Sequence, residues 1–235
     1  MPQPQMKDSL ILINAKQKID DFNRIGLHYN LVASSVYKKR STCADPFACS
    51  FLKYIIAGLI SFDMEQKMGK VEEAYDFKGT GFGSRLKLKL GKIRPNLERL
   101  MNLSLTEIEL HKYKQDILKA YCELATDGEG ALDNRGQHFL VGATKILHFL
   151  NPKLFIIVDS HAAEAFRTVH NVKFRKITQP GYSSQRYVDY MAFAQQDILT
   201  YGLERFKALD PDTPITRIYD KLTFMTGKLL KGGKL

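Results

Sequence analysis

The chain has 235 residues, of which 44% are hydrophobic and 26% are charged, a composition typical of a globular protein and not of a disordered one. Lys and Arg number 35 against 25 Asp and Glu, which gives a formal net charge of +10. This excess favours a polyanionic partner, with nucleic acid first and an anionic membrane surface second.

The spacing of the cysteines indicates whether the chain binds a metal, and the N-terminus and the apolar runs indicate whether it is exported or enters a membrane. Cys43, Cys49 and Cys122 form no CxxC pair and have no zinc-ligand spacing, so we expect free thiols, no metal site and no cofactor. The N-terminus lacks the pattern of a signal peptide. The longest apolar run, Tyr54 to Phe62, is far shorter than the roughly 20 residues of a membrane span. We therefore expect a cytoplasmic protein that does not enter a membrane.

The first 80 residues have helical patterns. Apolar residues between Leu10 and Ile25 predict an amphipathic helix that ends at Gly26. Asp45-Pro46 predicts the start of a second helix, which is apolar on most faces and runs to Gly69. The glycine-rich stretch 79–83 then predicts a hinge between an N-terminal helical lobe, 1–80, and a second lobe, 81–235. A single compact domain is the alternative.

A basic stretch follows the glycine-rich loop. Leu and Lys alternate from Leu86 to Leu90 with the period of a strand, whereas Ser84 is a suitable cap for a short helix. A minor strand pair here is the most β-structure that we expect. The basic side chains are a candidate strip for phosphate contacts, although a solvated face explains them equally well; they are Arg85, Lys87, Lys89, Lys92 and Arg94. The basic run from Lys228 to Lys234 is a secondary candidate.

The rest of the chain also predicts helices, over about 105–124, 137–150, 159 onward, 184–209 and 215–230. Asn151-Pro152 ends the second of these, and an apolar connection, 153–158, leads to the third. Sustained strand alternation is absent elsewhere in the sequence. We therefore expect an all-α, multi-helix fold.

Asp159 and His161 directly follow the apolar connection, in the segment FIIVDSHAAEAF. An aspartate at the start of a helix is most simply an N-cap, which binds the amides of the first turn. A single histidine with no evident partner is most simply a structural residue. Both residue types also occur in active sites, so the surrounding pattern has to be considered.

That pattern, a helix, a buried apolar connection, Asp-x-His and a second helix over residues 139–166, resembles the helix-hairpin-helix DNA glycosylase superfamily. It is most similar to the archaeal-type 8-oxoguanine DNA glycosylases. The resemblance implies a two-lobed helical fold, DNA more than RNA as the partner, and excision of a damaged base, with Asp159 and His161 as catalytic residues. The family's hairpin has a Gly-x-Gly that binds a DNA phosphate; the corresponding segment here departs from it, with Gly142 as the expected phosphate contact but no Gly-x-Gly.

The resemblance also bears on the reaction type. Bifunctional members of the family use a lysine as a Schiff base, but Val141 occupies that position here and Lys145 lies one turn further on. Lys145 is therefore expected to face another direction, which favours a monofunctional glycosylase that uses the aspartate alone. A carboxylate suits this reaction because cleavage of an N-glycosidic bond builds positive charge on the sugar. The alternative is a non-catalytic module that binds DNA, RNA or an acidic protein.

Overall fold

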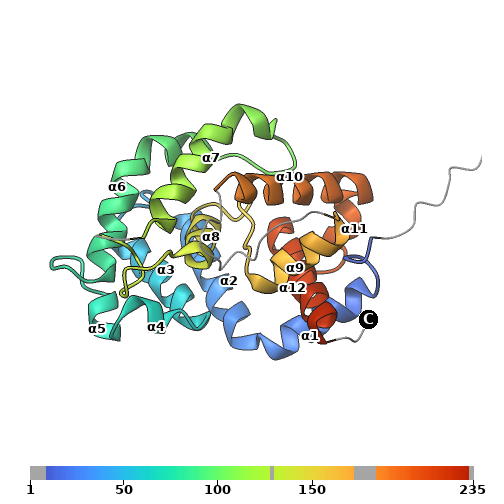
Figure 1. Cartoon of the computed structure of the whole chain (residues 1–235), viewed down its shortest axis with the longest axis horizontal. Coiled ribbons are helices and arrows are strands. Elements are labelled where there is room, and N and C mark those ends of the chain that lie inside the picture. The colour runs from blue at the N-terminus through green and yellow to red at the C-terminus, as the bar shows by residue number, and fades with distance from the viewer. Residues whose placement is uncertain (1–8, 128–129, 172–183, 233–235) are drawn as a thin grey trace, which may run out of the picture.

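The computed structural model of the chain describes residues 9–127, 130–171 and 184–232. All regular structure in these ranges is helical, which confirms the all-α class (Figure 1). The helices are α1 (Ala15–Ile25), α2 (Leu27–Thr42), α3 (Cys49–Ser61), α4 (Glu65–Met68), α5 (Val71–Ala74), α6 (Phe82–Leu100), α7 (Leu110–Ala125), α8 (Leu140–Leu150), α9 (Ser160–Val169), α10 (Ser184–Tyr201), α11 (Leu203–Lys207) and α12 (Ile215–Gly232).

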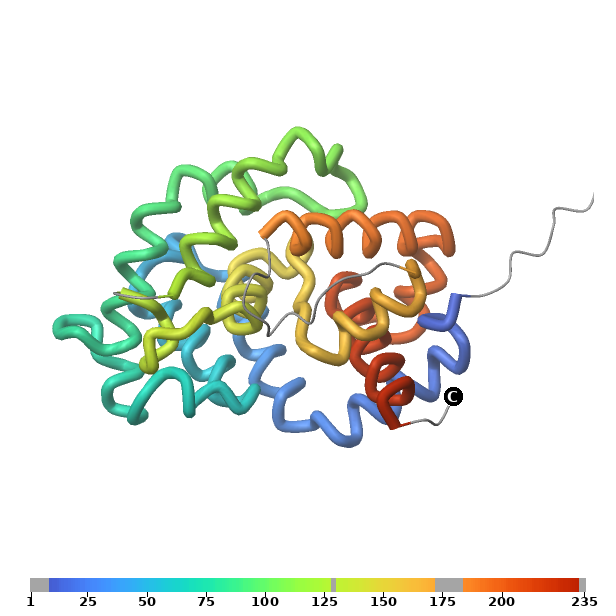
Figure 2. Tube along the Cα trace, in the orientation of Figure 1, coloured from blue at the N-terminus to red at the C-terminus, as the bar shows by residue number. Residues whose placement is uncertain are grey.

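The helices pack in two groups. Helices α2 to α8 form the first group. In the second group α12 contacts α1, α9, α10 and α11, while α1 also contacts α2 and α10 also contacts α7. Figure 2 shows α1 and α12 together at one end of the molecule, although they stand at opposite ends of the sequence. The chain passes between the groups at Gly26 and along the connection 151–159. The lobe boundary predicted at residue 80 falls between α5 and α6, which pack on each other in the first group.

Helix α8 lies at the centre of the protein. All of its residues except Val141 are buried, as expected for a helix that is apolar nearly all round. His148 binds two neighbours, since its Nδ1 lies 2.7 Å from the Phe155 carbonyl oxygen and its Nε2 lies 2.7 Å from the Tyr37 hydroxyl. Burial lowers the pKa of His148 to about 3. A neutral imidazole therefore fastens α2 and the connection to α8.

Of the two structures that the sequence left open for the Leu-Lys alternation, a strand or a short helix, the protein forms a helix, α6. Leu86, Leu90, Ile93 and Leu97 are all buried, and their spacing of four, three and four residues follows the helical period. Leu88, which shares the alternation, is 64% exposed. The longer apolar pattern outweighs the short alternating one because it buries a continuous face.

Two other predicted helices are interrupted. The helix expected from Pro46 to Gly69 divides into α3 and α4, with Asp63 between them at a φ of 56°. The helix expected over 184–209 divides into α10 and α11 at Gly202, which has a φ of 92°. A left-handed backbone conformation ends the regular hydrogen bonding of a helix. Ser183, whose residue type suits an N-cap for this helix in the sequence, lies outside the described residues.

The connection between α8 and α9 is held by side chains. Asn151 donates to the carbonyl oxygens of Leu100 and Leu103, at 2.8 and 2.9 Å. Further along, the Val158 amide donates to the Thr144 hydroxyl at 3.2 Å. Residues 154–158 are buried, so their backbone needs such partners. The connection therefore delivers Asp159 to the start of α9 in a fixed position.

Helices α9 and α12 meet closely at Gly227. A Cβ atom at this position would lie 1.8 Å from the carbonyl oxygen of His161, which is closer than any stable contact. Glycine is therefore required where α12 passes the first turn of α9. This close approach places the α12 side chains beside Asp159.

Candidate active site

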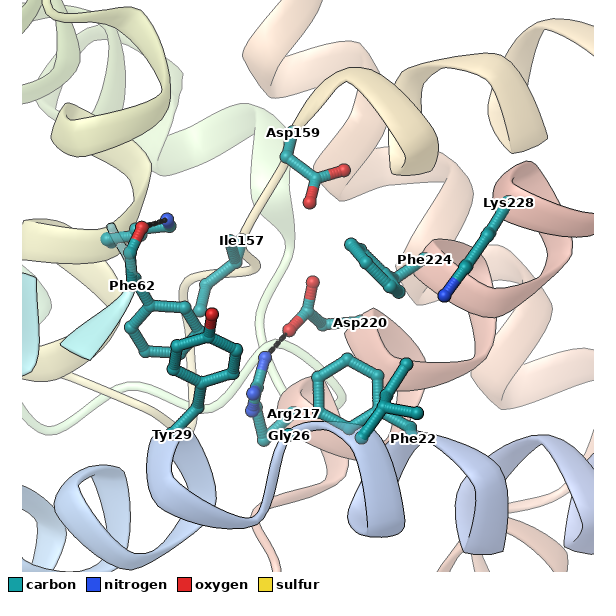
Figure 3. Close-up of a pocket in the computed structure, with 12 residues that line it drawn as sticks. Phe22, Gly26, Tyr29, Phe62, Ile157, Asp159, Arg217, Asp220, Phe224 and Lys228 are labelled. Atoms are coloured by element: carbon teal, nitrogen blue, oxygen red, sulfur yellow. Dashed lines mark hydrogen bonds and ion pairs between the residues drawn. The ribbon is translucent and has the colours of Figure 1, made fainter. Parts of the chain in front are cut away.

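A cavity of 290 Å³ lies where the two helix groups meet (Figure 3). Its walls come from the corner between α1 and α2, the end of α3, α8, the connection and α12. The lining residues are Phe22, Ile25, Gly26, Tyr29, Phe62, Lys145, Ile157, Asp159, Arg217, Asp220, Phe224 and Lys228. A cleft at the meeting of two structural units is a common location for a ligand site.

Asp159 caps α9 and faces the cavity. Its Oδ1 accepts hydrogen bonds from the backbone amides of His161 and Ala162, at 2.8 and 2.9 Å, as an N-cap aspartate does. Figure 3 shows the carboxylate pointing into the cavity. Both hydrogen bonds from the backbone amides go to Oδ1, which leaves Oδ2 for a ligand. The capping role predicted from the sequence is confirmed, and it leaves room for a second role.

Lys145 lies in the same cavity, and the expectation that it would face another direction was wrong. Helix α8 is buried on all sides, so the ammonium group reaches the cavity and not an outer face. The side chain is 7% exposed, and Nζ lies 3.4 Å from the Phe62 carbonyl oxygen and 4.5 Å from the centre of its ring. Burial lowers the pKa of Lys145 to about 8, against the opposing effect of Asp159 and Asp220. At pH 7 about a tenth of the amine is then neutral.

A buried ion pair between Arg217 and Asp220 forms the side of the cavity opposite Asp159 (Figure 3). The Arg217 guanidinium also lies 4.9 Å from the Phe22 ring and 5.3 Å from the Phe62 ring. Burial raises the pKa of Asp220 to about 6, while Arg217 opposes this rise. This pair was not predicted from the sequence. Its signal was an arginine and an aspartate three residues apart on the apolar face of a helix.

Aromatic side chains form two walls of the cavity. The Tyr29 and Phe62 rings are stacked, with centroids 5.2 Å apart and an angle of 8°. The Phe22 and Phe224 rings meet edge to face, with centroids 5.4 Å apart. Such walls suit a planar, partly apolar ligand. The sequence contains no Trp, so Phe and Tyr have to provide any stacking surface.

His161 is near the cavity but is not among the residues that line it. Its ring packs edge to face on Phe224, with centroids 4.9 Å apart. Burial lowers the pKa of His161, although Asp159 opposes this fall, and the neutral ring is favoured. The His161 ring therefore packs on Phe224, which lines the cavity, without lining the cavity itself.

The predicted basic strip does not form one surface. A helix advances by about 100° per residue, so α6 directs Arg85, Lys89 and Lys92 to one side and Lys87 and Arg94 to the other. A strand would have aligned the odd-numbered residues. Figure 1 shows α6 near one end of the molecule, whereas α9 and α12 lie toward the other end. The strip therefore does not face Asp159.

Acidic and carbonyl groups already bind most of the strip. Lys89 is 5% exposed and donates to the Glu123 carbonyl oxygen at 2.8 Å. Lys92 lies 3.5 Å from the carboxylate of Glu123, and Arg94 donates to Glu98 at 2.8 Å. These contacts reduce the positive potential that α6 offers to a phosphate.

Gly142 has a packing role in α8. It is buried, and the Phe139 ring occupies the place of a side chain, 1.9 Å from where a Cβ atom would stand. The segment between α7 and α8 covers residues 126–139, which is longer than a tight hairpin. The phosphate-binding role expected for Gly142 stays a prediction.

The basic residues beside the cavity come from α12. Lys228 lines the cavity and is exposed. Lys231 donates to the carbonyl oxygen of Ser160 at 2.9 Å and to its hydroxyl at 3.3 Å, at the N-terminus of α9. Both belong to the basic run from Lys228 to Lys234 that was the secondary candidate for phosphate contacts; Lys234 lies outside the described residues. The cavity mouth is therefore basic on the α12 side.

Within the described ranges, no group of three or more His, Cys, Asp or Glu side chains is arranged to hold a metal ion. No helix in the same ranges is long and apolar enough to cross a bilayer. Comparison of the chain with protein-family models, with curated proteins and with solved structures finds no match.

Proposed function

We propose that this protein is a DNA base-excision glycosylase whose cavity receives a nucleotide extruded from the duplex. The observation that carries the proposal is that Asp159 and Lys145 meet in one cavity with aromatic walls. Enzymes that act on a base within a duplex must extrude it into such a pocket and hold it by stacking. The resemblance of residues 139–166 to the helix-hairpin-helix glycosylases supports the same reaction.

Asp159 provides negative charge where the reaction develops positive charge. As the bond between C1′ and the base nitrogen breaks, its electron pair leaves with the base and C1′ becomes cationic. The free Oδ2 of Asp159 stabilises this cation, because it is not used by the two amides that the cap binds. The base takes up a proton from solvent and leaves as the neutral molecule.

Lys145 provides the nucleophile. Its neutral amine attacks C1′ as the base departs, and the resulting adduct opens to a Schiff base with loss of the sugar ring oxygen as an alcohol. The lowered pKa of Lys145 makes the neutral amine available near neutral pH. This assignment replaces the monofunctional reaction expected from the sequence, in which the aspartate acted alone.

DNA fits the charges around the cavity. Lys228 lines the cavity, Lys231 contacts Ser160 next to Asp159, and the protein has a formal charge of +10. Phosphates on either side of an extruded nucleotide would contact these lysines. The α6 strip is not used in this arrangement, and the non-catalytic module that depended on it has no structural observation in its favour.

The test uses duplex oligonucleotides that each contain one oxidised, deaminated or alkylated base. Base release is measured by chromatography, and Schiff-base formation is measured by borohydride trapping on denaturing gels. Asp159→Asn should lose at least about a hundredfold in release rate while keeping the fold, because asparagine is an equally good N-cap. Lys145→Gln should abolish trapping.

The exposed Lys53 on α3 gives the matched control, since Lys53→Gln removes one lysine without touching the cavity. It should behave as the wild type in both assays. Release that is unchanged in Asp159→Asn would overturn the role of the carboxylate. The absence of release from every oligonucleotide by the wild-type protein would overturn the proposed function.

A further inference from the structure

Arg217 is a buried cation that uses only part of its hydrogen-bonding capacity. Its side chain is 3% exposed and lines the cavity beside Asp220, across from Asp159 (Figure 3). Nη1 donates to the Asp220 carboxylate, whereas Nε and Nη2 are buried and have no hydrogen-bond partner among the described residues. Buried donors without a partner are costly and rare in native proteins. Two of them on one side chain that lines a cavity indicate that a ligand supplies the acceptors.

The surrounding rings hold the guanidinium group but do not complete its bonding. The Arg217 guanidinium lies 4.9 Å from the centre of the Phe22 ring and 5.3 Å from that of the Phe62 ring, and such rings attract positive charge. A phenyl ring has no lone pair, so neither ring accepts a conventional hydrogen bond from Nε or Nη2. The two rings and Asp220 therefore hold the guanidinium group in place and leave one edge of it for a ligand.

The two free nitrogens define which atoms the ligand presents. Nε–H and Nη2–H lie side by side on one edge of the planar guanidinium group, and this edge matches two neighbouring acceptors. The two buried cations of the cavity, Lys145 and Arg217, are balanced by two carboxylates. The interior therefore has no excess positive charge to bind a free anion, and it favours the acceptor atoms of a neutral planar base.

The O6 and N7 atoms of a 6-oxopurine are such a pair of acceptors. Arginine binds guanine through these two atoms in the major groove of DNA. Cytosine also has neighbouring acceptors, O2 and N3, but its O2 lies next to the nitrogen that carries the sugar. In the proposed reaction the sugar is at Asp159, and Arg217 lies across the cavity from that residue. A 6-oxopurine therefore fits the geometry better than cytosine.

Other purines present a donor to the same edge. In 8-oxoguanine N7 carries a hydrogen, and in adenine the substituent at C6 is an amino group. Either base would place one of its own N–H groups against an N–H of Arg217, and a site built for hydrogen bonding rejects such a mismatch. Hypoxanthine, the deaminated form of adenine, keeps both acceptors.

We propose that Arg217 selects a 6-oxopurine with an unsubstituted N7, so that the substrate is a deaminated purine such as hypoxanthine and not 8-oxoguanine. This inference rests on the proposed function and deepens it by naming the base. It differs from the oxidised base that the resemblance of residues 139–166 implies. Guanine has the same edge, but guanine in a matched pair costs more to extrude than a mismatched base.

Arg217 also acts on the leaving group. When the bond to C1′ breaks, its electron pair moves into the purine ring and negative charge develops on the ring nitrogens. The guanidinium N–H at N7 stabilises that charge. Selection and release therefore depend on the same contact.

The first test compares the release of hypoxanthine and 8-oxoguanine, each placed opposite thymine in the same duplex. The wild-type protein should release hypoxanthine at least about tenfold faster, the lower range for a bidentate contact. Arg217→Lys keeps a positive charge beside Asp220 but lacks the paired edge, so its ratio of rates should fall at least about fivefold below that of the wild type. Arg94→Lys, at the exposed ion pair with Glu98 on α6, is the matched control and should keep the wild-type ratio.

The second test measures binding without cleavage and needs no variant. Duplexes carry a 2′-fluoro nucleotide, which resists loss of the base, with either hypoxanthine or 7-deazahypoxanthine, in which a C–H group replaces N7. The wild-type protein should bind the hypoxanthine duplex at least about tenfold more tightly in fluorescence anisotropy, because the analogue leaves one charged donor without an acceptor. Arg217→Lys should bind the two duplexes equally.

Equal wild-type affinity for the two analogues would overturn the role of Arg217, as would faster release of 8-oxoguanine than of hypoxanthine. A ratio of rates that Arg217→Lys leaves unchanged would also overturn it. Failure of the proposed function gives a different result, since the wild-type protein would then release no base from any duplex. Failure of this inference alone gives release that does not depend on N7.

Discussion

Replacing Lys145 by methionine separates a catalytic lysine from a structural one. Methionine has a similar length and suits an irregular apolar site, so it removes the charge without opening a large gap. Burial lowers the pKa of Lys145 from 10.5 to about 8. At about 1.4 kcal/mol for each tenfold change in the protonation equilibrium, the protonated lysine costs the folded state about 3 kcal/mol. Lys145→Met should therefore raise the free energy of unfolding at pH 7 by up to about that amount while abolishing borohydride trapping.

The rise in the free energy of unfolding that Lys145→Met brings should become smaller as pH increases. Below pH 8 the lysine is protonated in both the folded and the unfolded state, and the full penalty is present. Between pH 8 and 10.5 the unfolded state binds more protons, so the wild-type protein becomes more stable as pH rises. The advantage of Lys145→Met should therefore shrink over this interval.

Urea unfolding at pH 7 and pH 9.5 measures both quantities. Lys53→Met is the control on an exposed position and should change stability by less than about 0.5 kcal/mol at either pH. A variant that is less stable than the wild type at pH 7 would show that the ammonium group stabilises the fold, and would refute this reasoning. If Lys145→Met is more stable than the wild type by the same amount at both pH values, the charge of Lys145 is not what destabilises the wild-type protein.

Further predictions concern packing and charge. Gly227→Ala should lower the free energy of unfolding by about 1–3 kcal/mol, and with it the melting temperature, because its Cβ would meet the backbone of α9. Gly91→Ala, whose Cβ would meet no atom within 4 Å, should instead raise the free energy of unfolding by about 0.5–1 kcal/mol. His148→Phe should destabilise the protein in urea by about 1–3 kcal/mol for each of the two buried groups that lose a partner. Lys228→Ala should reduce the salt slope of DNA binding by about 0.9, measured by fluorescence anisotropy, whereas Lys87→Ala should leave it unchanged.

Signals that act over a few residues were reliable in this sequence. Asp159 was predicted to cap a helix, and it binds the two amides that follow it, because capping involves only neighbouring residues. Asn151-Pro152 ends α8 for the same reason. The all-α class also followed from the sequence, since helical spacing of apolar residues recurs along nearly the whole chain.

Patterns with two local interpretations were less reliable. The Leu-Lys alternation of α6 fits a strand over a few residues, but the buried face of a helix extends to Leu97. Which pattern prevails depends on how much apolar surface the rest of the protein can cover. The helix also places the basic residues of the strip on two sides of α6.

The sequence by itself determined that the chain is helical and that Asp159 starts a helix after a buried connection. Only the tertiary structure decided what surrounds that aspartate. Lys145, the Arg217–Asp220 pair and the α1–α2 corner come from distant parts of the chain and meet because α12 crosses α9 at Gly227 and α8 lies at the centre. The direction of a buried side chain is set by the helices around it, and a sequence does not display those contacts.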